Sequence, residues 1–328
     1  MAWSTIRGHD AWVTAFARAA GRGRLAHAYL FAGPPGVGKR LFARQLAKTL
    51  LCEAPPDDDW DSCDACPACQ LVDAGTHPDL FLVGRPEDKL ELPIAVVQQL
   101  CADLALRPAR GTRKIAVVDD ADDFNDESAN AFLKTLEEPP PGSLLILVGT
   151  SSDTQLATIR SRCQVIPFAP LPTSIVEDLL RTSGDIDSDD AARLARLSDG
   201  SPGLARELAD ANLWAFREHF FAELAKPKPD APGLSREFHS LIEEAGKDSG
   251  AQRRRASLVL SLLLDGLREG LTRCVDGQAT SDIDAVAKRL GEDGLMRRIE
   301  RCLDAERHVE RRVQLSLAIE GLVDSVAV

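Results

Sequence analysis

A glycine-rich loop constrains this chain more than any other feature. The loop, Gly33-Pro34-Pro35-Gly36-Val37-Gly38-Lys39, follows the apolar run Ala28–Ala32 and precedes a helical pattern. This order of strand, loop and helix matches the G-x-x-x-x-G-K part of the phosphate-binding signature. The glycines let backbone N–H groups turn inward, and the helix N-terminus adds partial positive charge. The pattern predicts a nucleotide-phosphate site made by Gly33, Gly36, Gly38 and Lys39.

The residue after the loop departs from that signature. The full motif continues with Ser or Thr, whose hydroxyl binds Mg²⁺, but Arg40 stands there. A guanidinium is a permanent cation without an acceptor lone pair, so it cannot bind a metal ion. The sequence therefore predicts a site with the shape to hold ATP and Mg²⁺ that lacks part of the chemistry. Whether nucleotide is bound, and whether Arg40 blocks the site, stays open.

A second apolar run ends in two acids. Ile115–Val118 leads into Asp119 and Asp120, where P-loop ATPases place one acid on Mg²⁺ and a second, usually Glu, to activate water. Asp120 is one methylene shorter than Glu, and a displacement of about 1 Å can remove much of a catalytic rate. We predict that Asp119 and Asp120 belong to the nucleotide site. Solvent-facing acids are the simpler interpretation of Asp122 and Asp123.

Short apolar runs alternate with helical patterns through the first half of the chain. Strands separated by helices imply a mainly parallel sheet that is covered on both faces. Strand patterns cease after about residue 170, and helical patterns follow, with Gly200–Gly203 as a break between two helices. Further strands are expected at Leu80–Val83, Lys114–Val118, Leu144–Val148 and Val165–Phe168.

Length and charge restrict the function classes. A chain of 328 residues suggests two or three domains. Its net charge of −12 argues against broad duplex binding by this chain alone, because such binding uses Lys and Arg to neutralise phosphates. No apolar run approaches a membrane span, and no secretory signal is visible, so we expect a cytoplasmic protein.

Four cysteines follow the loop helix with the spacing C-x10-C-x2-C-x2-C. Overlapping C-x2-C steps let neighbouring thiolates converge on one ion, and a more distant thiolate can close the tetrahedron. Structural Zn²⁺ is the favoured interpretation, an iron–sulfur cluster is the rival, and unliganded thiols are favoured least. The predicted ligands are Cys52, Cys63, Cys66 and Cys69.

Three smaller features receive structural interpretations. Thr76–Asp79 is expected to be a turn before a strand, and His27 a structural histidine. The basic run Arg253–Arg255 opens a long helix and is expected to be solvated.

Several of these motifs occur in an order that is specific to one family. The chain resembles the delta-prime branch of the bacterial DNA polymerase III clamp-loader family, and its gamma/tau branch slightly less well. The resemblance covers most of residues 1–210. It rests on the four-cysteine insert together with His27–Phe31, His77–Asp79, Asn130–Pro140 and Ser161–Cys163.

The resemblance implies an α/β AAA+ P-loop module at 1–170, with the cysteine insert at about 52–69. A small helical lid at 171–212 and an all-α collar at 213–328 would follow. The collar joins five subunits in a ring, so the implied partners are gamma/tau and delta subunits and, through them, the sliding clamp and primer–template DNA. In such loaders the arginine of Ser-Arg-Cys reaches the ATP of a neighbouring subunit. We carry that trans role to Arg162.

Hydrolysing members of the family also carry a lid arginine in a Gly-Ser-x-Arg segment, where this chain has Gly203. Arg40, Asp120 and Gly203 together predict a clamp-loader subunit that does not hydrolyse ATP efficiently. The alternative is an active gamma/tau-like ATPase in which Lys39 and Asp119 compensate. A P-loop enzyme of small-molecule metabolism, such as a kinase, is a third hypothesis, favoured least.

Overall fold

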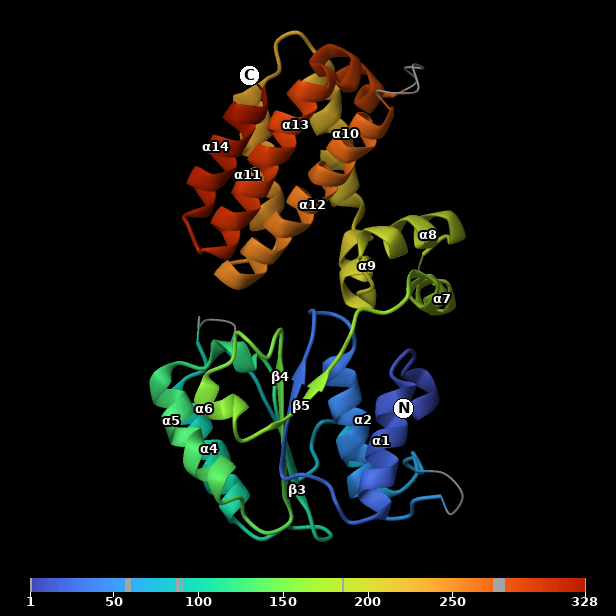
Figure 1. Ribbon diagram of the computed structural model, residues 1–328, viewed down its shortest axis with the longest axis vertical. Coiled ribbons are helices and arrows are strands. Elements are labelled where there is room, and N and C mark those ends of the chain that lie inside the picture. The colour runs from blue at the N-terminus through green and yellow to red at the C-terminus, as the bar shows by residue number, and fades with distance from the viewer. Residues whose placement is uncertain are drawn as a thin grey trace. The chain divides into compact units, whose positions relative to one another are not determined.

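The computed structural model describes residues 2–56, 60–86, 89, 91–184, 186–273 and 281–327. The chain divides into two compact units, Met1–Ala205 and Arg206–Val328. The first is an α/β unit and the second is helical (Figure 1). The three-part division at 170 and 212 stays a prediction.

The first unit is built on a parallel sheet with the strand order β2-β3-β4-β1-β5. The predicted fold class and the predicted strands are confirmed, within a residue at each end. β4 lies between β1 and β3, so the loop strand and the acid-bearing strand are not neighbours. The strands are β1 Ala28–Ala32, β2 Leu80–Val83, β3 Lys114–Val118, β4 Ser143–Gly149 and β5 Gln164–Pro167.

Alternate side chains of the central strands enter two separate apolar clusters. On one face, Tyr29 and Phe31 pack with Phe42 from α2. On the other face, Leu30 packs with residues such as Phe132 from α5. Figure 1 shows α1 and α2 on one side of the sheet and α4 to α6 on the other. Burial on both faces explains why β1 and the interiors of β3 and β4 are continuous apolar runs instead of alternating with polar residues.

The helices of the α/β part begin and end at recognisable signals. Gly38, with φ +102°, is the residue before α2, and Asn125 caps α5 by accepting from the Ser128 amide at 2.8 Å. The elements are η1 Trp3–Thr5, α1 Asp10–Gly21, α2 Lys39–Leu51, α3 Pro67–Asp73, α4 Ile94–Ala105, η2 Ala121–Asp123, α5 Asp126–Glu137 and α6 Ala157–Arg160.

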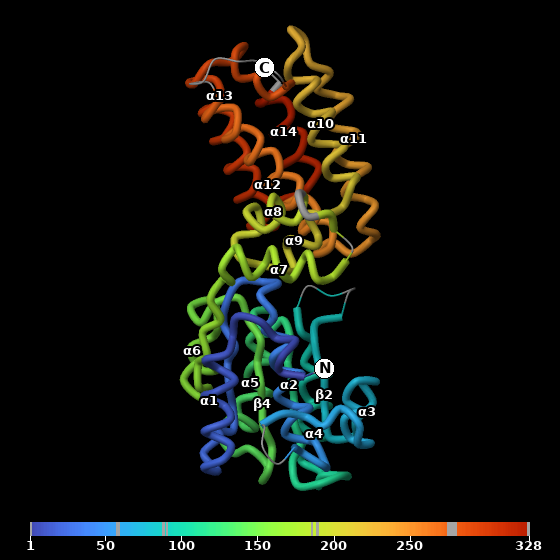
Figure 2. Tube along the Cα trace, turned by 90° about the vertical axis from the view of Figure 1, so that its right-hand side faces the viewer, coloured from blue at the N-terminus to red at the C-terminus, as the bar shows by residue number. Residues whose placement is uncertain are grey.

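Only helices follow β5 in the part of the chain that the structure describes. α10 to α14 pack side by side (Figures 1 and 2), and Gly291, with φ +63°, kinks α13. Within the described ranges, no helix is both long enough and apolar enough to cross a membrane. The helices are α7 Thr173–Ser183, α8 Ser188–Leu197, α9 Pro202–Leu208, α10 Ala211–Ala225, α11 Ala231–Glu243, α12 Ser249–Arg273, α13 Asp282–Glu310 and α14 Leu315–Ala327.

Two of the smaller predictions are confirmed. The His27 Nε2 atom lies 3.0 Å from the Leu136 carbonyl, as a structural histidine does. His77–Asp79 forms a turn before β2, in which buried Asp79 accepts from the amides of Ala109 and Arg110 at 2.7 Å each. The motif therefore fixes the loop between α4 and β3.

The prediction that Arg253–Arg255 is solvated is wrong for Arg253 and Arg255, whereas Arg254 is exposed and pairs with Glu207. Arg255 is bound to Asp210, Glu244 and the Leu241 carbonyl, so it ties three segments of the helical unit together. Arg253 donates to the carbonyl of Val309 in the last turn of α13 and to that of Val313 beyond its end. A charge run at a helix start does not reveal such partners, because all of them are distant in sequence.

Candidate nucleotide and metal sites

The glycine-rich loop connects the carboxyl end of β1 to α2. Gly36 and Gly38 have φ angles of +76° and +102°, which glycine adopts at no steric cost. The Lys39 Nζ atom donates to the carbonyls of Gly33 and Pro34 at 2.5 and 2.6 Å. An ammonium has three donors, so two orient the group and one is left for an anion. The N-terminal amides of α2 have no acceptor within the helix.

Lys39 is only 6% exposed. Burial lowers its pKa, and the nearby carboxylates of Asp119 and Asp122 act in the opposite direction. The side chain thus lies inside the loop, as a phosphate-binding lysine must. The loop, Lys39 and the helix N-terminus have the chemistry to hold a phosphate group, and the assignment of Gly33, Gly36, Gly38 and Lys39 to a nucleotide site stays a prediction.

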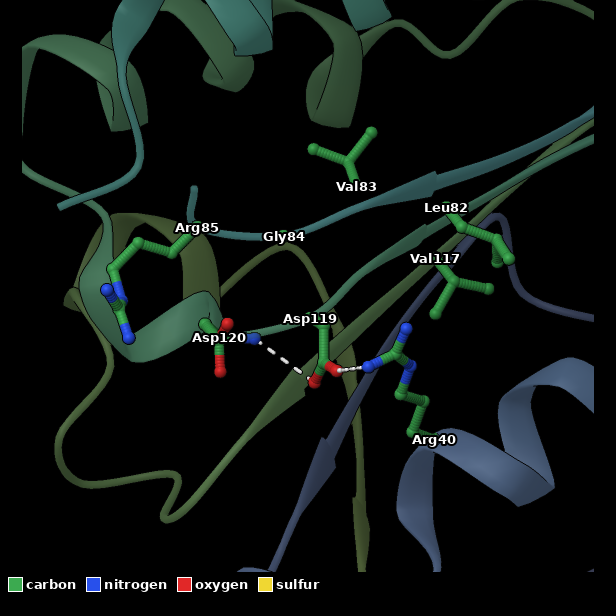
Figure 3. A pocket seen from close by; sticks show the side chains of 8 residues that line it. All are labelled: Arg40, Leu82, Val83, Gly84, Arg85, Val117, Asp119 and Asp120. Carbon is green, nitrogen blue, oxygen red and sulfur yellow. Dashed lines mark hydrogen bonds and ion pairs between the residues drawn. The ribbon is translucent and has the colours of Figure 1, made fainter. Parts of the chain in front are cut away.

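Arg40 contacts the acid that was predicted to bind Mg²⁺. A guanidinium nitrogen of Arg40 lies 3.3 Å from the Asp119 Oδ2 atom (Figure 3). Burial raises the pKa of Asp119, the Asp120 charge raises it further, and Arg40 opposes both. A metal ion here would need the Asp119 carboxylate and a hydroxyl from the loop as ligands. The carboxylate is paired with Arg40, and Arg40 also stands where the hydroxyl residue would be. These residues do not fit Mg²⁺.

The pair borders a pocket of about 200 Å³. Arg40 and the acids Asp119 and Asp120 lie on one side of it, and the end of β2 lies on the other (Figure 3). Asp120 has a left-handed backbone, with φ +52°, which is uncommon for aspartate. The pocket is lined by Arg40, Leu82, Val83, Gly84, Arg85, Val117, Asp119 and Asp120.

Asp122 has a role that the sequence interpretation missed. Its carboxylate accepts from the Thr150 amide at 2.5 Å and from the side chains of Thr154 and Gln155 at 3.0 Å each. It therefore ties the end of β3 to the loop that leaves β4. Asp123 bonds to Arg85 at 2.9 Å. Both acids therefore have protein partners. These partners could be predicted only by knowing which strands lie next to each other in the sheet.

The segment before α9 lies directly on the glycine-rich loop. The Ser201 hydroxyl donates to the Pro35 carbonyl at 2.9 Å, and the Gly203 amide donates to the Gly36 carbonyl at 3.0 Å. A Cβ atom on Gly203 would lie 2.7 Å from the Gly36 Cα atom. Gly203 therefore cannot be replaced by a larger residue without moving the loop. The resemblance implies that hydrolysing members of the family carry arginine at this position.

Arg162 lies at the amino-terminal ends of the strands, whereas the glycine-rich loop of the same chain lies at their carboxyl ends. Arg162 lies two residues before the start of β5, which runs parallel to β1, and Gln164 is level with Tyr29. The length of β5, roughly 13 Å at 3.3 Å per residue, separates Arg162 from the carboxyl ends of the strands, where the glycine-rich loop begins. The Arg162 guanidinium contacts Glu137, through Nε at 2.8 Å, and donates to the Thr158 carbonyl at 2.8 Å. It remains 32% exposed.

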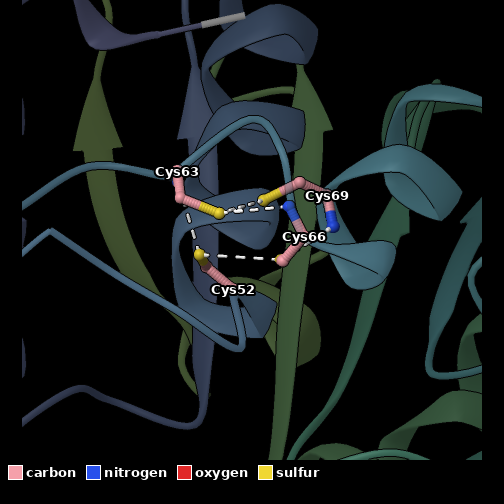
Figure 4. A group of neighbouring side chains, drawn as sticks. All are labelled: Cys52, Cys63, Cys66 and Cys69. Carbon is pink, nitrogen blue, oxygen red and sulfur yellow. Dashed lines mark hydrogen bonds between the residues drawn. The ribbon is translucent and has the colours of Figure 1, made fainter.

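The predicted cysteines are brought together. Their sulfur atoms lie within 4.8 Å of one another (Figure 4), and the pairs Cys52–Cys66 and Cys63–Cys69 are each 4.0 Å apart. A tetrahedron with metal–sulfur bonds of about 2.3 Å has sulfurs roughly 3.8 Å apart. The cluster therefore fits a single ion. A multi-iron cluster would hold its four thiolates farther apart.

The cluster is anchored to α2 and to its own backbone. Amides of Cys63, Cys66 and Cys69 point at neighbouring sulfurs at 3.3–3.5 Å, which stabilises negative charge on them. Lys48 of α2 is 1% exposed and pairs with Asp64 at 2.5 Å and Asp73 at 2.6 Å. Residues on both sides of the last cysteine are thus fixed to the helix that carries Lys39.

The fold and the loop define a P-loop module of the AAA+ type followed by an all-helical region. The family model of the DNA polymerase III delta subunit matches residues 8–172. The delta' subunit of Escherichia coli K12 is 34% identical over 249 residues, which are 76% of this chain and 71% of that protein. The chain belongs to the delta' family of DNA polymerase III subunits, and the family resemblance predicted from its motifs is confirmed.

Two further relatives set the limits of the match. The delta' subunit of Pseudomonas aeruginosa is 38% identical over 190 residues, 57% of each protein. The tau subunit of Escherichia coli K12 is 34% identical over 165 residues, 49% of this chain and 24% of tau. The similarity to tau covers about half of the chain.

Proposed function

We propose that this chain is a ring subunit of the replicative clamp loader that supplies Arg162 in trans and does not hydrolyse ATP itself. The proposal extends the family assignment to partners: gamma/tau and delta subunits in a five-membered ring and, through them, the sliding clamp and primer–template DNA. It places the chain in the bacterial cytoplasm, and it divides the chain into a module at 1–170, a lid at 171–212 and a collar at 213–328.

One observation supports the trans role: Arg162 lies where the parallel strands begin, and the glycine-rich loop lies where they end. An arginine so placed has no access to phosphate on its own loop, so a phosphate that it binds would belong to a nucleotide on another chain. A planar, permanently charged fork suits a γ-phosphate and stabilises the charge that develops during its transfer. Glu137 holds the guanidinium in place until a stronger anion competes for it.

The chain's own loop supports the second half of the proposal. Arg40 is paired with the acid that would hold the metal, and Gly203 lies against the loop where an arginine has no room. Asp120 is short for its role. Phosphoryl transfer depends on a metal ion and an arginine that stabilise the developing charge. The departures at Arg40, Gly203 and Asp120 would therefore all weaken ATP hydrolysis.

The test is ATP hydrolysis by the reconstituted loader with Arg162→Ala in this subunit. The adjoining site should lose roughly 10³-fold of its rate, seen as the loss of one site's amplitude in rapid-quench hydrolysis, while the ring still assembles. Arg160→Ala is the matched control, because Arg160 is an exposed, ion-paired arginine two residues away. An intact amplitude in an assembled Arg162→Ala ring would refute the trans role.

An active gamma/tau-like ATPase remains the second candidate, because the Lys39 geometry is intact. The two candidates differ in what the isolated chain does. Turnover by the purified chain that disappears with Lys39→Ala would establish the second candidate; an inactive isolated chain supports the first. The family assignment favours both over a metabolic enzyme.

The four-cysteine cluster is proposed to hold one structural Zn²⁺. The sulfur separations support a single tetrahedral ion over an iron–sulfur cluster. Four thiolates leave no open position for a substrate, so the ion would act on stability and not on chemistry.

A further inference from the structure

We propose that the nucleotide site of this chain binds ATP without Mg²⁺, because Arg40 neutralises Asp119 in place of the metal. The inference deepens the proposed non-hydrolysing role and rests on it for the identity of the ligand. It names the ligand as a metal-free nucleoside triphosphate. The observation behind it is the contact of 3.3 Å between Arg40 and the Asp119 carboxylate.

The charge balance of the site carries the argument. In an ordinary P-loop site the metal has two roles: it neutralises phosphate oxygens, and it neutralises the acid at the end of the acid-bearing strand. Without masking, the Asp119 charge would repel an incoming polyphosphate. Like charges within a few ångströms repel by several kcal/mol at the effective dielectric of a protein surface, about 4 kcal/mol at 4 Å. Arg40 removes this repulsion without an ion.

The position of Arg40 in the chain makes the substitution permanent. Arg40 is the second residue of α2, directly after Lys39, so its backbone is fixed by the loop. Its side chain is 71% exposed and extends across the pocket mouth toward Asp119 (Figure 3). A guanidinium is a permanent cation with no acceptor lone pair. A metal would have to displace it and would find no loop hydroxyl.

The remaining phosphate-binding groups do not depend on the metal. Lys39 is held by the carbonyls of Gly33 and Pro34 with one N–H left over. Gly36 and Gly38 keep the left-handed angles that turn the loop around an anion. Backbone amides and a helix N-terminus bind anions whether or not a cation is present. Binding and hydrolysis are thereby separated: the first is retained and the second lacks its metal.

The experiment is ATP binding to the purified full chain by isothermal titration calorimetry, with excess Mg²⁺ or with none. The metal-free buffer is passed over a chelating resin before protein is added, since a soluble chelator would strip the cysteine cluster. We expect the wild-type Kd to differ by less than about threefold between the two buffers. Arg40→Thr restores the hydroxyl and unmasks Asp119, so it should bind ATP about tenfold or more tightly with Mg²⁺ than without it.

Two controls keep the result specific. Arg40→Lys keeps a cation beside Asp119 and should behave as the wild type. Arg18→Thr removes the same charge from an exposed position of α1 and should also leave the Kd unchanged.

The inference is overturned if wild-type protein binds ATP tenfold more tightly with Mg²⁺, or fails to bind ATP in either buffer. These measurements use the isolated chain. Their failure is therefore distinguishable from failure of the Arg162 proposal, which is measured in the assembled ring.

Discussion

The two ends of α2 differ in how their acidic or sulfur side chains can be neutralised. At its first turn, Arg40 takes the place of a metal ligand and pairs with Asp119. Just beyond its last turn, Cys52 joins three other cysteines in a cluster whose sulfurs have the spacing of a metal site. The first site has a side-chain cation beside its carboxylate, and the second brings four cysteine sulfurs together.

The difference reflects what each site must accomplish. Four thiolates within 4.8 Å of one another would repel unless a cation lay between them, and no single side chain supplies four bonds. A carboxylate beside a phosphate loop needs only one neutralising charge when no phosphoryl transfer follows. On the two proposals made above, one end of α2 would function without a metal ion and the other would hold a structural one.

Removing a cluster ligand should have the largest effect. Cys69 is fully buried, so Cys69→Ser should reduce bound zinc from about one ion per chain to none. We expect the first unit to lose several kcal/mol of stability, about 3 kcal/mol or more, which lowers its Tm by roughly 6–12 °C. Metal analysis and thermal unfolding measure the two results.

Cys101→Ser is the matched control, because Cys101 lies outside the cluster and bonds to Thr135 at 3.2 Å. Its metal content should equal that of the wild type. Equal stability of the Cys69 variant and the wild type would mean that the cluster is not a structural site. An iron content of several atoms per chain would replace the zinc assignment with a cluster.

Gly203→Ala should have a smaller effect at the other end of α2. The added Cβ would meet the Gly36 Cα atom at 2.7 Å, and backbone cannot move aside as a side chain can. We expect a loss of about 1–2 kcal/mol, because the strain of roughly 1–3 kcal/mol exceeds the helix propensity gained by alanine. Urea unfolding measures the change.

Gly21→Ala provides the comparison within the same unit. Gly21 ends α1, and nothing lies within 4 Å of the position that its Cβ would occupy. This variant should be neutral or slightly stabilised. If Gly203→Ala behaves as Gly21→Ala does, the segment before α9 does not rest on the loop as described.

Arg40→Ala should have the smallest effect on stability. Arg40 is 71% exposed, and exposed ion pairs contribute about 0–1 kcal/mol. We therefore expect the free energy of unfolding to change by less than about 1 kcal/mol, although the same residue controls the metal dependence of binding. A loss of several kcal/mol would show that the pair is structural, and it would weaken the comparison between the two ends.

The strands and the cluster were predictable because their signals are local. Apolar runs such as Lys114–Val118 predict buried strands, and the cysteine spacing predicts convergence of the thiols. The loop motif placed Lys39 correctly for the same reason. In each of these cases the residues that interact are close in sequence or repeat with a fixed period.

The long-range contacts around the candidate site were not predictable, because they depend on which strands are neighbours. The sequence showed that Arg40 cannot bind a metal, but not that it reaches Asp119, almost 80 residues later. Asp122 was interpreted as solvated because the loop after β4 was not known to lie beside it. The close approach of Gly203 to Gly36 likewise joins segments that no periodicity relates.

The central place of β1 has a consequence for synthesis of the chain. β1 is made first, but both of its neighbours, β4 and β5, are made last. At roughly 5–20 residues per second, the strand waits on the order of ten seconds for its partners. The cysteine cluster closes over a short stretch of sequence and can form in that interval. The ion would then anchor the end of α2 before the sheet is complete, and the glycine-rich loop would be the last part to become rigid.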